Sequence, residues 1–174
     1  MAATGSKLGW ILYGMKQKLI ADGVYTAQSC RIAMRMNVPQ HTKGRDYAVI
    51  LPLMHTFNAN NFIGQGRYSS IVSGRINVYV RHQDAKDQAY YDDIWLVGQD
   101  GNGGALGELD RVMDSLDGWN PTLAQVGFGT SSVALLADEL RWVFTNEPRK
   151  DYASPDWGEV MAECEVKYRA WRNN

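Results

Sequence analysis

The sequence has little of what metal-binding and redox proteins need, because its 174 residues include only two cysteines and three histidines. Cys30 and Cys164 lie far apart, with no CxxC motif and no histidine-rich segment beside them, so a zinc site has no support. Each cysteine lies in an alternating apolar pattern. That pattern predicts two buried free thiols, although one disulfide would also fit two cysteines.

The sequence also lacks an excess of charge and a long apolar run. Its 18 basic and 19 acidic residues give a formal net charge of −1, which supplies no field to attract nucleic acid or an anionic membrane. The longest apolar run, around Ala48–Met54, is far shorter than the roughly 20 residues that span a bilayer. We read Leu8–Met15 as a helix and not as a secretion signal. We therefore expect no membrane partner and no sequence-specific nucleic-acid partner.

Catalytic and cofactor motifs are missing as well. No histidine belongs to an HExxH pair. A nucleophile elbow requires a serine between two glycines, and Gly127–Ser131 has none there. Gly64–Gly66 does not continue as a dinucleotide-binding loop. Asp100–Gly104 lacks the glutamate and the ligand spacing of an EF-hand. We expect a protein that is not an enzyme and that needs no cofactor and no metal.

Two helices are indicated by apolar residues that recur every three or four positions. The first covers residues 7–21 and ends at Asp22-Gly23, where glycine can adopt the left-handed conformation that closes a helix. The second starts at Asp84, is broken by the glycine-rich residues 98–104 and continues to Leu116. The expected buried faces comprise Leu8, Ile11, Leu12, Met15, Leu19 and Ile20 in the first helix, and Leu106, Leu109, Met113 and Leu116 in the second.

Strands are indicated where apolar and polar residues alternate. The expected strands are Ser29–Val38, Tyr47–Leu51, Ile71–His82, Leu140–Thr145 and Val160–Ala170. Tyr47–Leu51 is uniformly apolar, which favours a central position in the sheet. Pro52 should end its pairing, because proline has no N–H to donate. The last strand should have one buried face and one charged face.

The order of these elements is a helix, three strands, a broken helix and a terminal hairpin. Strands grouped with few crossover helices are typical of an α+β fold with a mostly antiparallel sheet and helices packed on one face. We expect a single domain over residues 1–174, with long loops at residues 55–70, 98–104 and 146–158.

Aromatic residues are frequent in these expected loops, where they could fold back onto the core or contact other subunits. Aromatics are enriched at interfaces between proteins. The expected loop at residues 146–158 also carries two adjacent basic residues, Arg149 and Lys150. The candidate subunit-interface residues are Phe57, Phe62, Tyr68, Arg149, Lys150, Tyr152 and Trp157.

The order of elements resembles that of the bacteriophage tail-terminator family, the minor tail protein U-like neck and tail-completion proteins. The matching features are a helix at Leu8–Ile20, strands at Tyr47–Leu51 and Arg75–Val80, a helix at Ala85–Trp95 and a charged strand at Glu159–Trp171. The resemblance implies an α+β structural subunit that forms a ring, usually a hexamer. Such a ring caps the tail tube and offers a surface to the head–tail connector. The implied locations are the virion tail or neck, and the host cytoplasm during assembly.

Three departures from the family pattern leave other functions open. They are a longer excursion at Phe57–Ser70, a glycine break in the helix at residues 98–104 and an extended loop at Asn146–Gly158. A different neck or tail-tube protein would also fit. A small-ligand or carbohydrate-binding module could use Trp119, Tyr152 or Trp157 as a stacking platform. A hydrolase could use an acidic site at Asp110 and Asp114.

Overall fold

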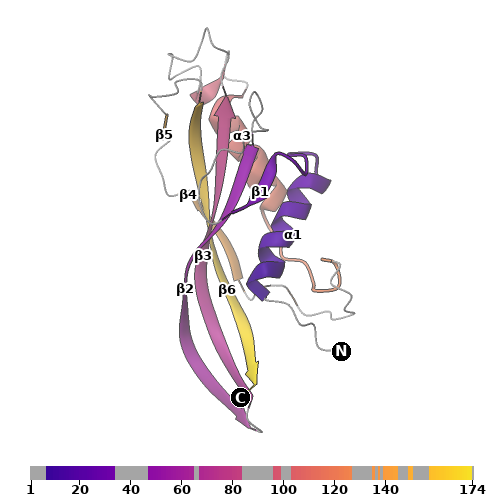
Figure 1. Cartoon of the computed structure of the whole chain (residues 1–174), viewed down its shortest axis with the longest axis vertical. Coiled ribbons are helices and arrows are strands. Elements are labelled where there is room, and N and C mark those ends of the chain that lie inside the picture. Colours follow the sequence, from indigo (N-terminus) through magenta and orange to yellow (C-terminus); the bar gives the residue numbers. More distant parts are fainter. Residues whose placement is uncertain are drawn as a thin grey trace.

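The structure, a computed structural model, describes residues 7–33, 47–64, 67–83, 96–98, 103–126, 135, 137, 139–144, 149–150 and 157–173, and along parts of the strands it describes the backbone alone. The elements are α1 (Lys7–Ala21), β1 (Cys30–Ile32), β2 (Tyr47–Gly64), β3 (Arg67–Gln83), α3 (Gly104–Leu116), β4 (Glu139–Phe144), β5 (Arg149–Lys150) and β6 (Trp157–Asn173). Figure 1 shows the long strands as one curved sheet with both helices on the same side.

The six strands form one sheet in the order β1-β2-β3-β6-β4, with β5 also paired to β6. β1 runs parallel to β2, and the other pairs are antiparallel. The predicted α+β fold, with a mostly antiparallel sheet and helices on one face, is therefore confirmed. The predicted central position of Tyr47–Leu51 is confirmed too, because this part of β2 lies between β1 and β3.

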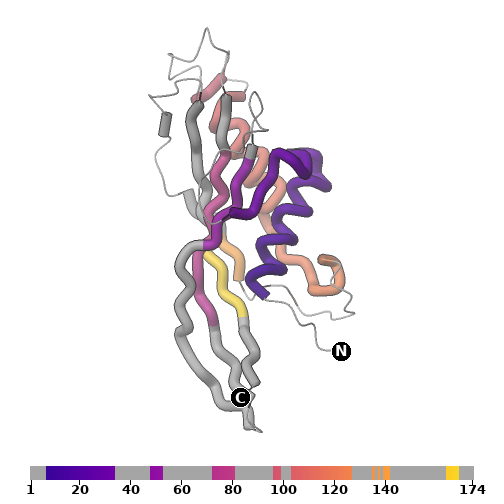
Figure 2. The backbone as a smooth tube through the Cα atoms, viewed as in Figure 1, coloured from indigo at the N-terminus to yellow at the C-terminus, as the bar shows by residue number. Residues whose placement is uncertain are grey.

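The core lies between the helices and one face of the sheet, and α1 and α3 lie side by side over it (Figure 2). α1 begins and ends where the periodicity predicts, and Gly23 after it has a positive φ of 72°. In α3 the buried face is rotated slightly from the predicted one, since Ala105 and Val112 are fully buried while Leu106 and Met113 are only partly so. The sheet contributes alternating buried residues: Ala48, Ile50, Val72, Ile76, Val78, Val80, Cys164, Val166 and Tyr168.

The structure contradicts parts of two of the predicted loops. Residues 55–64 and 67–70 belong to β2 and β3, which pair as a long hairpin. In the 146–158 segment, residues 149–150 form β5 and residues 157–158 begin β6, while residues 146–148 and 151–156 lie outside the described residues. Of the third loop, Gly98 and Gly103 lie outside any helix, Gly104 begins α3, and residues 99–102 lie outside the described residues.

Pro52 does not end the pairing of β2, contrary to expectation, because its nitrogen faces away from β3. The N–H of Ala48 donates to the carbonyl of Ser29 at 2.8 Å, and the carbonyl of Ile50 accepts from Ala33 at 3.1 Å. Every second residue of β2 therefore turns its backbone polar groups toward β1, and Pro52 continues this series. No β2–β3 hydrogen bond is lost at Pro52, which is paired with Ile76 in the ladder.

The strands are much longer than the helices that cover them. β3 has 17 residues paired to β6 along its whole length, which corresponds to roughly 55 Å at about 3.3 Å per residue. α1 has 15 residues and α3 has 13, so the helices are only about 20–22 Å long. Toward the C-terminal end of β6, Val72 and Tyr168 are the last paired residues whose burial is described, and both are buried. The helices therefore leave part of the sheet uncovered beyond that pair.

Candidate assembly surfaces

The uncovered part of the sheet is a three-stranded ribbon that we call the arm: residues 55–64 of β2, 67–71 of β3 and 169–173 of β6. In Figure 1 it extends beyond the helices as a curved projection. The register of β2 against β3 shifts three times, between Pro52 and His55, between Phe57 and Ala59, and between Phe62 and Gly64. β-Bulges of this kind bend a strand and increase its twist, which accounts for the curvature.

Three of the seven candidate interface residues lie on the arm. Phe57 is paired with Val72, and Phe62 is paired with Tyr68. Cross-strand partners lie on the same face of a sheet. Tyr68 and Val72 are four positions apart in β3, an even offset, so all three aromatic positions share the face that the helices cover farther along. The sequence placed these residues in a loop, and the structure places them together on a strand pair.

The other candidate interface residues do not join this group. Trp157 is paired with Gln83 at the opposite end of the long strands. Arg149 and Lys150 form β5 and pair with Glu159 and Gly158 near that same end. Tyr152 lies outside the described residues. The six candidates that the structure describes therefore divide between two ends of the sheet.

The face of the sheet opposite the helices carries charged pairs across neighbouring strands. The Lys167 Nζ donates to Glu139 Oε2 at 2.7 Å, and Arg75 lies 3.9 Å from Glu165. The hydrogen bond with Lys167 lowers the pKa of Glu139, and the same bond raises the pKa of Lys167. All four side chains are about half exposed, so this part of the face is in contact with solvent, and the charged face predicted for the last strand is confirmed at Glu165 and Lys167. Val49 and Leu51 of β2 lie on the same face and are buried.

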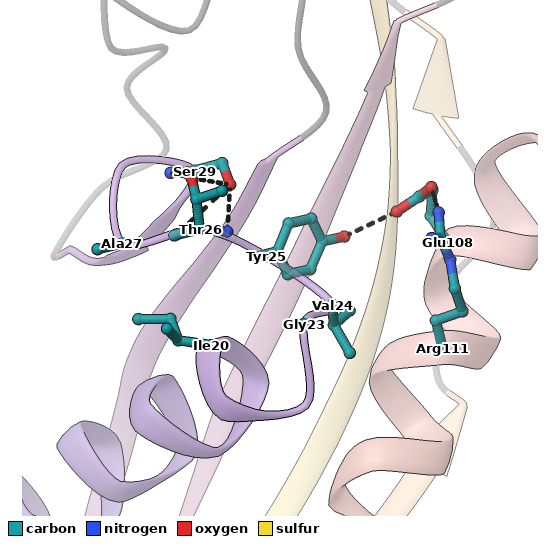
Figure 3. A pocket seen from close by; sticks show the side chains of 9 residues that line it. All are labelled: Ile20, Gly23, Val24, Tyr25, Thr26, Ala27, Ser29, Glu108 and Arg111. Carbon is teal, nitrogen blue, oxygen red and sulfur yellow. Dashed lines mark hydrogen bonds and ion pairs between the residues drawn. The ribbon is translucent and has the colours of Figure 1, made fainter.

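An open cavity of about 580 Å³ lies between the turn after α1 and the middle of α3 (Figure 3). Its walls include Ile20, Val24 and Tyr25 on one side and Glu108 and Arg111 on the other. Figure 3 shows the Tyr25 ring between the two sides, with its hydroxyl directed at Glu108. Tyr25 donates to Glu108 Oε2 at 3.3 Å. The sequence gave no indication of this cavity, because Tyr25 and Glu108 are 83 residues apart.

Glu108 is the buried charge of this cavity, with 7% of its surface exposed. A buried carboxylate is costly unless it is paired and hydrogen-bonded. Arg111, one turn farther along α3, forms an ion pair with Glu108, and Tyr25 supplies the hydrogen bond. These contacts satisfy the carboxylate from within the chain, and they fasten the turn after α1 to α3.

A second polar contact joins the same two elements. Asp22, directly after α1, accepts a hydrogen bond from Ser115 of α3 at 2.7 Å and forms an ion pair with Lys18, also at 2.7 Å. The hydrogen bonds from Lys18 and then Ser115 lower the pKa of Asp22. Together with the Tyr25–Glu108 bond, this contact fixes α1 against α3, so the helical layer is held as one unit beside the arm.

The residues of the two alternative functions are placed as follows. Trp119 packs against α1, where a side chain at Gly14 would come within 3.0 Å of its ring. Trp157 lies in β6, and Tyr152 is outside the described residues. Asp110 and Asp114 are exposed on α3, on the side away from its buried residues.

Within the part of the chain that the structure describes, no cluster of three His, Cys, Asp or Glu side chains could hold a metal ion. Cys30 and Cys164 are both buried and not bonded to each other, so the predicted free thiols are confirmed. No described helix has the length and apolar character needed to cross a membrane. Scans against protein-family models and against curated proteins find no match to this sequence.

Proposed function

We propose that this chain is a structural subunit of a bacteriophage virion, a tail terminator that forms a ring at the head-proximal end of the tail tube and joins the tube to the neck. The observation that carries the proposal is the arm. A ribbon of three strands that continues beyond its own helical layer exposes more backbone and surface than a solitary subunit needs, and such extensions supply contacts between subunits.

Two further features support an assembly role. The arm carries three aromatic positions, Phe57, Phe62 and Tyr68, on one face, and aromatic residues are favoured where proteins meet. The contacts of Glu108 and Asp22 join the turn after α1 to α3 and so hold the two helices together. A rigid helical layer with a projecting arm is suited to a subunit that must bind neighbouring subunits in a fixed geometry. We propose six copies per ring, with the tail-tube protein and the head–tail connector as partners.

Native mass spectrometry and negative-stain electron microscopy of the purified chain test this proposal. We expect closed rings, either alone or after addition of tail tubes. A terminator caps a tube once, whereas a tube protein adds to itself repeatedly. Single closed rings would therefore support the terminator, and long filaments would favour the tube-protein alternative. A chain that stays monomeric with and without tubes would overturn the proposal.

A further inference from the structure

The two outer edges of the arm differ in how their backbone groups are used. Hydrogen bonds in an antiparallel pair alternate, so every second residue of a strand turns its N–H and C=O toward one neighbour and the next residue turns them to the other side. Ala48 and Ile50 of β2 face β1. Their partners Val80 and Val78 of β3 therefore turn their backbone N–H and C=O groups toward β6. The same alternation extends along the whole of β3, because its register with β6 has no shift.

The alternation identifies the outward residues of β2 in the arm. Ser73, Ile71 and Ser69 face β2, so their partners Thr56, Ala59 and Asn61 are bonded to β3. The β2 residues that turn their backbone groups outward, away from β3, are those paired with the even-numbered β3 residues 68–74. These residues, which we call the β2 edge, are His55, Phe57, Asn60 and Phe62.

The same argument applies on the other side of the arm. In β6 the odd-numbered residues turn their backbone groups away from β3. Among them, Glu159 pairs with β5, and Glu163, Glu165 and Lys167 pair with β4. β4 ends at the pair Glu139 and Lys167. Beyond it, the backbone groups of three residues point outward with no partner strand among the described residues: Arg169, Trp171 and Asn173, which we call the β6 edge.

Unpaired strand edges invite another strand, and proteins that must stay monomeric block them with charges or prolines. Residues 53–64, which contain the β2 edge, include no Lys, Arg, Asp, Glu or Pro. The β6 edge carries Arg169, and Arg172 lies within the same segment. Pairing β6 with β6 of another copy would place two arginine-bearing edges side by side, whereas pairing β6 with β2 brings no like charges together.

The strand directions also favour pairing between unlike edges. β2 and β6 are both antiparallel to β3, so they run parallel to each other. A second copy placed beside the first in the same orientation would continue the sheet through a parallel β6–β2 pair. Such a head-to-tail contact repeats, and it closes into a ring when the rotation allows.

We propose that the β6 edge of one copy pairs with the β2 edge of the next copy, and that this pairing is the contact that builds the ring. The inference rests on the proposed ring and names the surface that forms it. The bulges in β2 interrupt its outward series between Phe57 and Asn60, whereas the β6 edge is a regular series, so the β6 edge can pair in regular register with one side of this interruption.

Proline substitutions at outward positions test the pairing, because Pro52 shows that an outward position of β2 accepts proline. Asn60→Pro removes an outward N–H of the β2 edge, and Arg169→Pro removes one of the β6 edge. Asn60→Thr and Arg169→Thr keep the N–H and serve as matched controls. Circular dichroism and thermal unfolding should show all four variants folded. Native mass spectrometry should show rings for both threonine variants and monomers for both proline variants.

Mixing the two proline variants gives the sharpest readout. Asn60→Pro retains an intact β6 edge and Arg169→Pro retains an intact β2 edge, so an equimolar mixture should form a dimer of twice the 19.5 kDa chain mass and nothing larger. Rings that persist in either proline variant, a dimer of Asn60→Pro alone, or a mixture that stays monomeric would overturn the edge pairing. Persistent rings would leave the proposed function intact, whereas a wild-type chain without rings would remove both.

Hydrogen–deuterium exchange of the wild-type ring gives the same test should a proline variant unfold. The amide of Asn60 should exchange at least tenfold more slowly in the ring than in dilute monomer, while the amide of Asn61, which is bonded to β3 in both states, should change little. Equal rates at Asn60 in the two states would contradict the pairing.

Discussion

The packing around α1 and α3 predicts different effects on stability for two glycine-to-alanine substitutions. A Cβ at Gly14 would lie 2.7 Å from Cγ1 of Val126 and 2.9 Å from Cη2 of Trp119, so these side chains must move to admit it. A Cβ at Gly107 in α3 would have no neighbour within 4 Å. The two positions are both inside helices, and they differ in the space around them.

The magnitudes follow from two terms. Alanine is favoured over glycine inside a helix by about 0.8–1 kcal/mol, and this term acts at both positions. Forcing an extra methyl group into a packed site costs about 1–3 kcal/mol, and this term acts only at Gly14. Gly107→Ala should therefore be the more stable variant by about 1–3 kcal/mol, which corresponds to about 2–12 °C in Tm for a chain of this size.

Urea unfolding followed by tryptophan fluorescence, together with thermal unfolding, measures both variants against the wild type. We expect Gly107→Ala to unfold at a higher temperature than the wild type, and Gly14→Ala at a temperature below that of Gly107→Ala. Because Trp119 lies against Gly14, its emission should also change in Gly14→Ala. Equal stabilisation by the two substitutions would refute the close packing of α1 against Trp119 and Val126.

Three further substitutions test the polar contacts. Tyr25→Phe removes the hydroxyl that donates to buried Glu108 and should lower the free energy of unfolding by about 1–2 kcal/mol in urea; no change would show that the bond contributes nothing. Asn120→Asp replaces the amide that donates to the Ala137 carbonyl at 2.8 Å, so we expect a loss of about 1–3 kcal/mol, measured in the same way at pH 7. The pKa of Asp22 is held below its ordinary value of 3.8, so its carboxylate stabilises the folded state above that pH, and this contribution is lost as the pH falls through the folded-state pKa. Asp22→Asn should therefore weaken the fall in Tm at acid pH, and an unchanged acid profile would contradict the assignment.

The sequence predicted the fold best where the core imposes a regular period. Ile76, Val78 and Val80 alternate in β3, and Cys164 and Val166 alternate in β6, and all five are buried as the alternation indicates. One face of each strand must contact the helices, so burial selects apolar residues at every second position. The helix bounded by Lys7 and Ala21 was predictable for the same reason, with a different period.

The arm was not predictable because it lacks that constraint. Its residues pair through backbone groups, which all residue types share, and the register shifts after Pro52, Phe57 and Phe62 interrupt any period of two. Asparagine and glycine are frequent there, which made residues 55–70 look like a loop. The contact between Tyr25 and Glu108 had no local signal either, since only the packing of α1 against α3 brings them together.

Labelling of assembled tails tests the central claim most directly. A small epitope fused to the chain, detected with gold-labelled antibody in electron micrographs of tails, should appear as a single cluster at the head-proximal end of each tube. Label distributed along the tube, label at the distal tip, or tails without label would contradict the account of this chain as a tail terminator.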